Sequence, residues 1–105
     1  MTIEIYQDEY GKEPFYQWFY SIKDFRTQAR IDNRLERLRS GNFGDYRSLG
    51  GGIFELRFHF GPGYRIYYGR LGNEIVVLLI GGDKNSQMRD VKKTQQYWED
   101  YKRNK

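Results

Sequence analysis

The sequence predicts a small α+β domain with the element order β-α-α-β-β-β-α. Aromatic and aliphatic residues recur at helical spacing near the N-terminus, the pattern changes to strict alternation after residue 52, and a continuous apolar run follows at residues 75–80. Periods of 3.6 and 2 distinguish helices from strands. We expect a small, mostly antiparallel sheet with an N-terminal helix pair and a C-terminal helix, forming a single domain over residues 1–105.

The N-terminal part predicts a strand and then a helix pair. A short alternating run, Ile3–Tyr6, predicts the strand. Pro14 suits the first turn of a helix, and apolar residues follow it at helical spacing as far as Ile22. Asp24 can cap a second helix, with Gly41 just past its end. We expect this second helix to turn these residues inward: Phe25, Ala29, Leu35 and Leu38.

A hairpin is predicted after the turn-rich segment 41–52. Apolar and polar residues alternate up to Phe60, Gly61–Gly63 predicts a three-residue loop, and residues 64–70 form the returning strand. This loop places Phe60 opposite Tyr64 and keeps the apolar residues on one face. The other face then carries these polar residues: Glu55, Arg57, His59, Arg65 and Tyr67.

The C-terminal part predicts a central strand and a last helix. Ile75–Ile80 is continuously apolar, as in strands covered on both faces. Lys84 leaves this strand at the rim of the polar face, and Ser86 can begin the helix. The inward stripe of that helix is predicted to be Met88, Val91, Gln95, Trp98 and Tyr101 or Lys102.

The composition excludes several classes of protein. The chain has 18 Lys and Arg against 14 Asp and Glu, no Cys and one His. Disulfide scaffolds, thiolate metal sites, Cys nucleophiles and catalysis by two His residues are excluded, and no metal or cofactor is expected. The N-terminus lacks the pattern of a signal peptide, and the longest apolar run is too short to cross a bilayer. We expect a soluble, cytoplasmic protein.

The polar face of the hairpin is the candidate site. Its cations can hold a phosphodiester, Tyr67 can stack a base, and His59 can move a proton. An ordinary solvated sheet face, with Glu55 paired to an Arg, remains an alternative. The Arg-rich face of the second helix suits RNA, a partner or plain solvent. Gly50–Gly52 lacks the spacing of a phosphate-binding loop and indicates a loop before a strand.

Three motifs carry a resemblance to a known family: GGGIFELR at residues 50–57, GPGYRIYY at 61–68 and GGDKNSQ at 81–87. The chain resembles the HigB-like branch of the RelE/ParE toxin superfamily, often labelled addiction module killer proteins. The resemblance extends over nearly the whole chain and implies a RelE-like fold. It also implies a toxin of a type II toxin–antitoxin system that cleaves mRNA on the translating ribosome without a metal.

The resemblance implies roles for particular residues. Arg57, Arg65 and Lys84 match positions that are basic in RelE-like toxins. Glu55 stands where some relatives carry Lys, so it acts as a base or orients Arg57. Asp90 falls near the position of a Tyr proton donor, which leaves that role open. Contacts with RNA are expected from Tyr67, Gln87 and Arg89.

Two other functions remain open within the same superfamily. ParE-like members poison DNA gyrase, and a relative without activity would do no more than bind an antitoxin; fold alone does not decide. The resemblance implies a cognate antitoxin of the helix-turn-helix type as partner, in a toxin–antitoxin hetero-oligomer. Exposed aromatic residues such as Tyr16, Tyr20 and Tyr97 are possible anchors for it.

Overall fold

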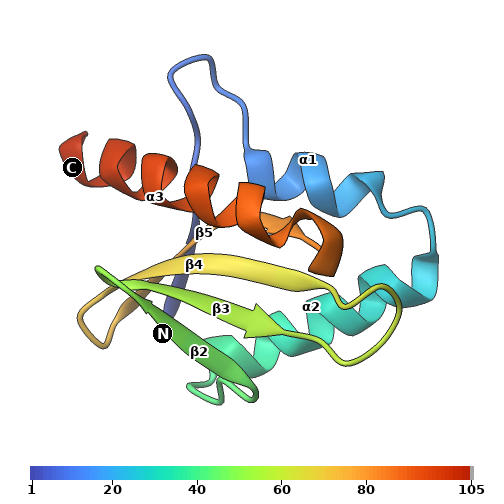
Figure 1. Cartoon of the computed structure of the whole chain (residues 1–105). Helices are drawn as coiled ribbons and strands as arrows, with labels where there is room; N and C mark the ends of the chain where they lie inside the picture. Colours follow the sequence, from blue (N-terminus) through green and yellow to red (C-terminus); the bar gives the residue numbers. More distant parts are fainter. Residues whose placement is uncertain (105) are drawn as a thin grey trace.

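A five-stranded mixed sheet forms the centre of the structure, a computed structural model that describes residues 1–104 (Figure 1). The strand order is β1-β5-β4-β3-β2, with β1 parallel to β5 and the other pairs antiparallel. The elements are β1 (Thr2–Ile5), α1 (Pro14–Ser21), α2 (Phe25–Arg39), β2 (Tyr46–Gly50), β3 (Ile53–Arg57), β4 (Arg65–Leu71), β5 (Ile75–Gly82), a 3₁₀ turn (Lys84–Ser86) and α3 (Gln87–Arg103). The predicted α+β class is confirmed.

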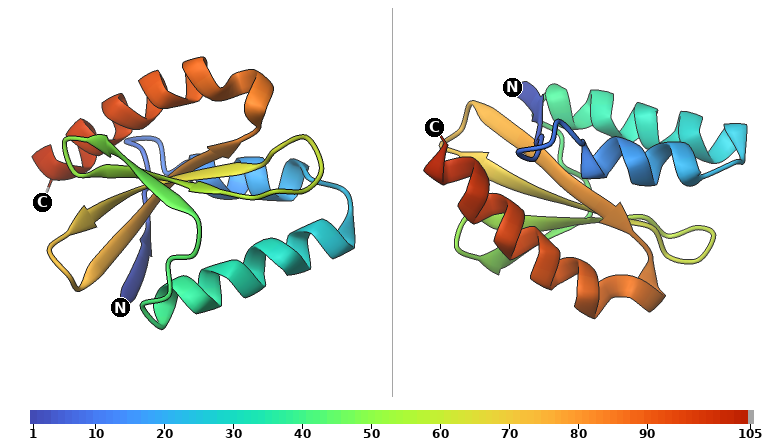
Figure 2. Two further views of the ribbon diagram at one scale, coloured as in Figure 1. Left: turned by 60° about the horizontal axis from the view of Figure 1, so that its bottom comes forward. Right: turned by 90° about the horizontal axis from the view of Figure 1, so that it is seen from above.

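Helices cover both faces of the sheet. In Figure 2, α1 and α2 lie on one side and α3 on the other. The larger core, under α1 and α2, includes Phe15, Ile31 and Leu56, none of which has exposed surface. The smaller core lies under α3 and centres on Trp98. Since α3 crosses the sheet obliquely, part of β2, β3 and β4 remains uncovered on its side (Figure 1).

The prediction of a helix pair is confirmed, and the predicted inward face of α2 is right at Leu35 and Leu38 but wrong at Phe25 and Ala29. The Asp24 side chain accepts hydrogen bonds from the Arg26 N–H and the Thr27 hydroxyl and so caps α2. Phe25 is 84% exposed and Ala29 is also exposed. The buried residues of α2 are Thr27, Ile31 and Leu38. Seven residues make almost two full turns, so Ile31 and Leu38 define a stripe that excludes Phe25 and Ala29.

The chain contains a strand that the sequence analysis missed. β2 pairs antiparallel with β3 within the segment predicted as turns. Its residues are mostly exposed, because β2 lies at the edge of the sheet, and it therefore lacks an apolar alternation. Gly50, Gly51 and Gly52 all have positive φ and form the turn between β2 and β3. The observed order is therefore β-α-α-β-β-β-β-α.

The β3–β4 register differs by two residues from the prediction. Arg57 pairs with Arg65, and Glu55 pairs with Tyr67. The predicted three-residue loop is wrong. A tight turn runs from Phe60 to Gly63 instead, closed by a hydrogen bond of 3.3 Å from the Gly63 N–H to the Phe60 carbonyl. The ladder hydrogen bonds end earlier, so residues 58–64 connect the strands. A shift of two residues returns every side chain to its original face, and the polar face survives.

The last helix begins after a turn capped by Asp83, whose carboxylate accepts hydrogen bonds from the Asn85 and Ser86 N–H groups. The predicted inward stripe of α3 is wrong at Met88, which is 82% exposed, and at Gln95, which is exposed. The buried residues are Asp90, Thr94 and Trp98. Trp98 sets this face, since its ring packs on the backbone of Gly69 and its indole N–H donates to the Gly51 carbonyl.

Gly69→Ala is expected to lower the free energy of unfolding by about 2–3 kcal/mol, because an added Cβ would overlap the Trp98 ring and force it out of place. The measurement is urea denaturation. Gly72→Ala is the control, since Gly72 has a positive φ but open space around it, and its expected cost is about 1 kcal/mol. A Gly69→Ala protein as stable as the Gly72→Ala protein would contradict this packing.

Candidate functional site

A buried carboxylate lies at the centre of the part of the sheet face that the helix α3 does not cover. Glu55 on β3 has no exposed surface. Its Oε2 accepts a hydrogen bond of 2.8 Å from Gln87 Nε2 and lies 3.6 Å from Arg65 Nε, and its Oε1 lies 3.5 Å from Arg47 Nε. A buried charge needs such partners. The pairing of Glu55 with an Arg, which the sequence analysis gave as an alternative, is thus observed. Glu55 faces Arg47 and Arg65 and does not orient Arg57.

A second carboxylate, that of Asp45, contacts side chains at and just after the C-terminal end of β3. Asp45 Oδ1 lies 3.0 Å from Arg57 Nη2, and its Oδ2 is hydrogen-bonded to the ring of His59. These hydrogen bonds hold the pKa of Asp45 below its usual value. The Arg34 guanidinium donates to the carbonyls of Asp45 and Arg57 and fixes the loop beside β3. Arg57 and His59 are therefore held in place by a common anion.

Lys84 lies beside Arg65 at the rim of this face. The Arg65 Nη1 donates to the Gly63 carbonyl at 2.8 Å, and the Lys84 N–H donates to the Pro62 carbonyl at 3.3 Å. A Cβ at Gly63 would lie 3.3 Å from Arg65 Nη1 and 3.4 Å from Lys84 Cβ. Gly63 thus lies between the Arg65 guanidinium and the start of the Lys84 side chain.

Tyr67 lies under this group of charges. Its ring and hydroxyl have no exposed surface, and burial together with the nearby Glu55 and Asp90 carboxylates raises the pKa of the phenol. The phenol therefore stays protonated at neutral pH. Stacking needs an open ring face, so the predicted stacking of a base on Tyr67 does not fit its burial. Tyr67 remains a candidate proton donor beneath the site.

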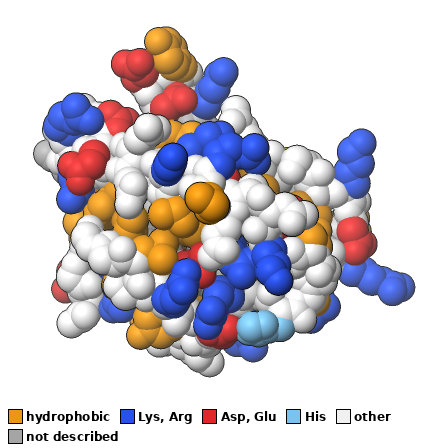
Figure 3. Space-filling view, viewed as in Figure 1, with side chains coloured by type: hydrophobic (Ala, Val, Ile, Leu, Met, Phe, Trp, Pro, Cys, Tyr) orange, Lys and Arg blue, Asp and Glu red, His pale blue; other side chains and the backbone are white. Residues whose placement is uncertain are grey.

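Several buried polar atoms of this face lack a hydrogen-bond partner among the described residues: Glu55 Oε1, Arg57 Nε, Arg65 Nε and the Tyr67 hydroxyl. Glu55 Oε1 and Arg65 Nε are nevertheless paired by charge, with Arg47 Nε at 3.5 Å and with Glu55 Oε2 at 3.6 Å, and the Tyr67 hydroxyl lies near the Glu55 carboxylate. Figure 3 shows Lys and Arg side chains gathered beside the histidine on this face. We call this group the basic cluster: Arg47, Arg57, Arg65 and Lys84, with Glu55 between them.

The remaining predicted site residues divide between two places. Gln87, the first residue of α3, belongs to the basic cluster through its hydrogen bond to Glu55. Asp90 and Arg89 instead line a cleft between α1 and α3. The Asp90 carboxylate accepts a hydrogen bond from the Ser86 hydroxyl, and burial raises its pKa. Asp90 therefore does not take the place of a proton donor within the basic cluster.

Sequence reasoning missed Arg47 and Asp45. Both precede or occupy β2, the strand that it also missed. A signal was present, because Gly50–Gly52 directly precedes a predicted strand, and a glycine-rich turn at that place is typical of a hairpin. Extending that hairpin backwards places Arg47 opposite Glu55, as observed.

Metal and membrane features are absent from the described part of the chain. Among residues 1–104, no three His, Asp or Glu side chains lie close enough together to hold a metal ion. No helix in the same range is long and apolar enough to cross a membrane.

Comparison with known proteins identifies a relative in Haemophilus influenzae. It is described as an uncharacterized protein and is 46% identical over 78 residues, which cover 74% of this chain and 79% of the relative. The chain belongs to the same family as this Haemophilus protein. No family model matches the chain. Since the description of the relative gives no activity, function in this family has to be argued from the basic cluster.

Asp45→Asn is expected to lower the free energy of unfolding by about 0.5–1 kcal/mol at pH 7, because it weakens a partly exposed contact with Arg57 and His59. The pKa of Asp45 is lower in the folded state than in the unfolded state. Its stabilising effect is therefore present above the unfolded pKa and lost as the pH falls through the folded pKa.

Urea denaturation of the wild type and Asp45→Asn between pH 7 and pH 2 measures this difference, which should shrink below about pH 4. Asp32→Asn, at an exposed position on α2, is the matched control and should cost less at pH 7. A difference between the wild type and Asp45→Asn that is constant over the whole pH range would contradict the assigned contacts.

Proposed function

We propose that this protein is the toxin of a type II toxin–antitoxin system and cleaves mRNA on the translating ribosome without a metal. The observation that carries the proposal is the convergence of Arg47, Arg57, Arg65 and Lys84 on one open sheet face around Glu55. The resemblance of the motifs at residues 50–57, 61–68 and 81–87 to HigB-like RelE/ParE toxins supports it.

The cations suit the chemistry of RNA cleavage. The ribose 2′-hydroxyl loses its proton and attacks the adjacent phosphorus, and the bond from phosphorus to the 5′-oxygen breaks. The products are a 2′,3′-cyclic phosphate and a 5′-hydroxyl, which gains a proton. Negative charge grows on the phosphate oxygens in the transition state, and guanidinium groups held in advance stabilise it. Arg57 and Arg65 are held in this way, by Asp45 and by Glu55.

Proton transfer has fewer candidates. His59 is 77% exposed in its side chain and is oriented by Asp45, so its ring is accessible to a substrate. Tyr67 is a neutral phenol whose raised pKa makes it a weak acid. Glu55 is engaged by Gln87 and two Arg residues, which weakens it as a base. The rate therefore comes mainly from positioning and charge stabilisation, and the ribosome can supply further groups.

The proposal includes partners and a location. A cognate antitoxin of the helix-turn-helix type would form a hetero-oligomer with this chain and keep RNA away from the basic cluster. The toxin would act in the cytoplasm, where mRNA is translated. An acidic segment of the antitoxin would complement the net charge of +4.

The test is primer extension on mRNA in a purified translation reaction. The wild type is expected to produce discrete cuts within ribosome-covered codons, and Arg65→Ala to reduce cleavage by about 100-fold or more, because it removes a donor to the transition-state charge. Arg26→Ala removes a cation from the exposed start of α2 and should cleave like the wild type.

Folding of the variants is checked by circular dichroism, and Arg65→Lys, which keeps the charge but not the planar donor fork, should retain part of the activity. Intact mRNA with undisturbed translation would refute the ribonuclease proposal. Inhibition of DNA gyrase supercoiling by the same preparation would then assign the chain to the gyrase poisons. Equal cleavage by the wild type and Arg65→Ala would move the site away from the basic cluster.

A further inference from the structure

The outer side of the edge strand β1 is open. β1 pairs with β5 on one side only, where the N–H groups of Thr2 and Tyr6 donate to backbone carbonyls at 2.8 and 3.0 Å. Successive residues of a strand direct their backbone groups to opposite sides, so those of Ile3 and Ile5 point away from β5. Within residues 1–104, no hydrogen bond reaches these outward groups. A row of unpaired N–H and C=O groups at a sheet edge is a template for another strand.

A hollow of about 450 Å³ lies beside this edge, between β1, α1 and α2. Ile3 and Ile5 direct their side chains to this side of the sheet and pack against the larger core. Tyr16 of α1 and Leu35 of α2 also line the hollow, and all four residues are only partly buried. In strand addition, backbone hydrogen bonds hold the added segment and pockets take its alternate side chains. The hollow provides such a pocket.

Acidic side chains border the hollow. Asp32 and Glu36 of α2 are exposed there, and Arg39 is the single Lys or Arg among the described residues that line it. Arg39 Nε lies 3.5 Å from Glu36 Oε1, so these two charges offset each other. The amino group of Met1, which donates to the Arg39 carbonyl at 2.9 Å, stands at the start of β1. Asp32 is therefore the remaining charge of the lining.

A further carboxylate lies close to the same lining. Burial raises the pKa of the Tyr16 phenol, and the neighbouring Asp32 and Glu13 carboxylates raise it further. Two anions thus act on an aromatic ring of the hollow, although the chain as a whole has a net charge of +4. The opposite edge strand, β2, carries Arg47 of the basic cluster. The two edges of the sheet therefore differ in charge, and a basic ligand is favoured at β1.

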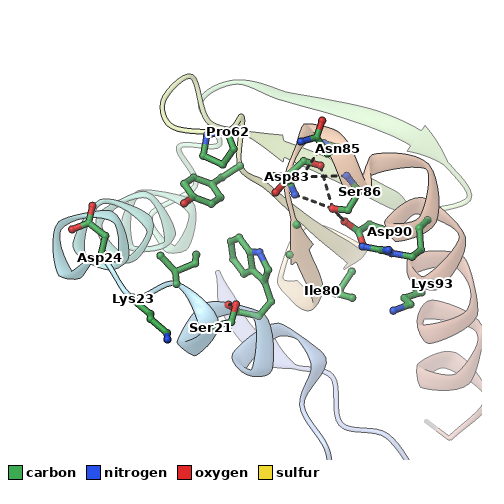
Figure 4. Close-up of a pocket in the computed structure, with 16 residues that line it drawn as sticks. Ser21, Lys23, Asp24, Pro62, Ile80, Asp83, Asn85, Ser86, Asp90 and Lys93 are labelled. Atoms are coloured by element: carbon green, nitrogen blue, oxygen red, sulfur yellow. Dashed lines mark hydrogen bonds between the residues drawn. The ribbon is translucent and has the colours of Figure 1, made fainter.

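The larger cleft between α1 and α3 has no such preference (Figure 4). In Figure 4, Lys23 and Asp24 lie on one side of that cleft and Asp83 and Lys93 on the other. Charges of both signs on each side do not select a ligand by its charge. The hollow beside β1 combines one prevailing sign of charge with an open strand edge, and so indicates a particular kind of ligand.

We propose that the outer side of β1 binds an extended basic peptide segment of a partner protein as a sixth strand of the sheet, with apolar side chains in the hollow and Lys or Arg side chains beside Asp32 and Glu13. The added strand runs antiparallel to β1, because parallel pairing is less stable per residue, and it exchanges two hydrogen bonds with each of Ile3 and Ile5. The proposal goes beyond the proposed function and does not rest on it, since an acidic antitoxin segment suits the basic cluster and is repelled here.

A second copy of this chain fits the edge less well. Two β1 strands that pair antiparallel about Glu4 would set the two Glu4 side chains opposite each other and bring two acidic hollows side by side. Like charges directly opposite each other destabilise a strand pair. A basic peptide meets neither penalty.

The test is an NMR titration of the ¹⁵N-labelled protein with the blocked peptide Arg-Thr-Val-Lys-Val-Thr-Arg, which has both Val and both Arg side chains on one face. The peptide is expected to shift the amides of Ile3, Ile5 and Leu35. It should also slow hydrogen exchange at the Ile3 and Ile5 amides by at least about tenfold, because these N–H groups gain acceptors. The Glu4 amide, which already faces β5, is the internal reference.

Matched peptides and variants identify what holds the strand. A peptide N-methylated at both Val residues cannot donate to β1 and should bind at least about tenfold more weakly, as should Glu-Thr-Val-Glu-Val-Thr-Glu, which reverses the charge. Asp32→Lys should weaken binding of the basic peptide. Glu99→Lys, the same change at an exposed position on α3, should leave it unchanged.

The proposal is overturned if the acidic or the N-methylated peptide binds as well as the basic one, or if the basic peptide shifts β2 instead. Slow exchange at Ile3 and Ile5 in the free protein, together with a dimer in sedimentation, would assign the edge to a second copy and refute it as well. None of these outcomes bears on the cleavage of mRNA, which the translation reaction tests separately.

Discussion

The carboxyl group of Glu55 lies on a sheet face with no exposed surface, and the arrangement of that face depends on it. Moving a carboxylate out of water costs several kcal/mol unless partners surround it. Its partners come from different elements: Arg47 from β2, Arg65 from β4 and Gln87 from the first turn of α3. The edge strand, the hairpin and the last helix must all be in place before this charge is satisfied.

The consequence is a set of cations that are held before any substrate arrives. Glu55 positions Arg47 and Arg65, while Asp45 positions Arg57 and His59. Groups fixed in advance lose little freedom when they bind an anion, which is the basis of electrostatic stabilisation in enzymes. A phosphate would meet the exposed parts of Arg47 and Arg57, whose side chains are 51% and 36% exposed.

Much of the fold followed from local patterns. The helix pair was predicted because Pro14 and Asp24 act at helix starts through their own backbone and side-chain chemistry. The polar face was predicted although the register was off by two residues, since the strand period of two makes the face insensitive to that error. The places of Glu55, Arg57 and Arg65 on that face were predicted for the same reason.

The remaining features depend on tertiary packing. β2 is an exposed edge strand without an apolar pattern, so only the Gly50–Gly52 turn indicated it and, with it, the places of Arg47 and Asp45. The inward faces of α2 and α3 are set by Ile31 and Trp98, which pack on distant strands. The close approach of Asp90 to Gly82 and of Trp18 to Gly81 joins residues from separate elements. No local period predicts such contacts.

The most direct test of the basic cluster is an NMR titration with a short RNA that cannot be cleaved because its 2′-hydroxyls are methylated. The arginine Nε–H signals of Arg47, Arg57 and Arg65 are followed, with Arg26 on α2 as an internal reference. The account predicts that the three sheet arginines shift together, saturate at one RNA concentration and respond less in Glu55→Gln. Shifts confined to the arginines of α2, with the sheet arginines unchanged, would contradict it.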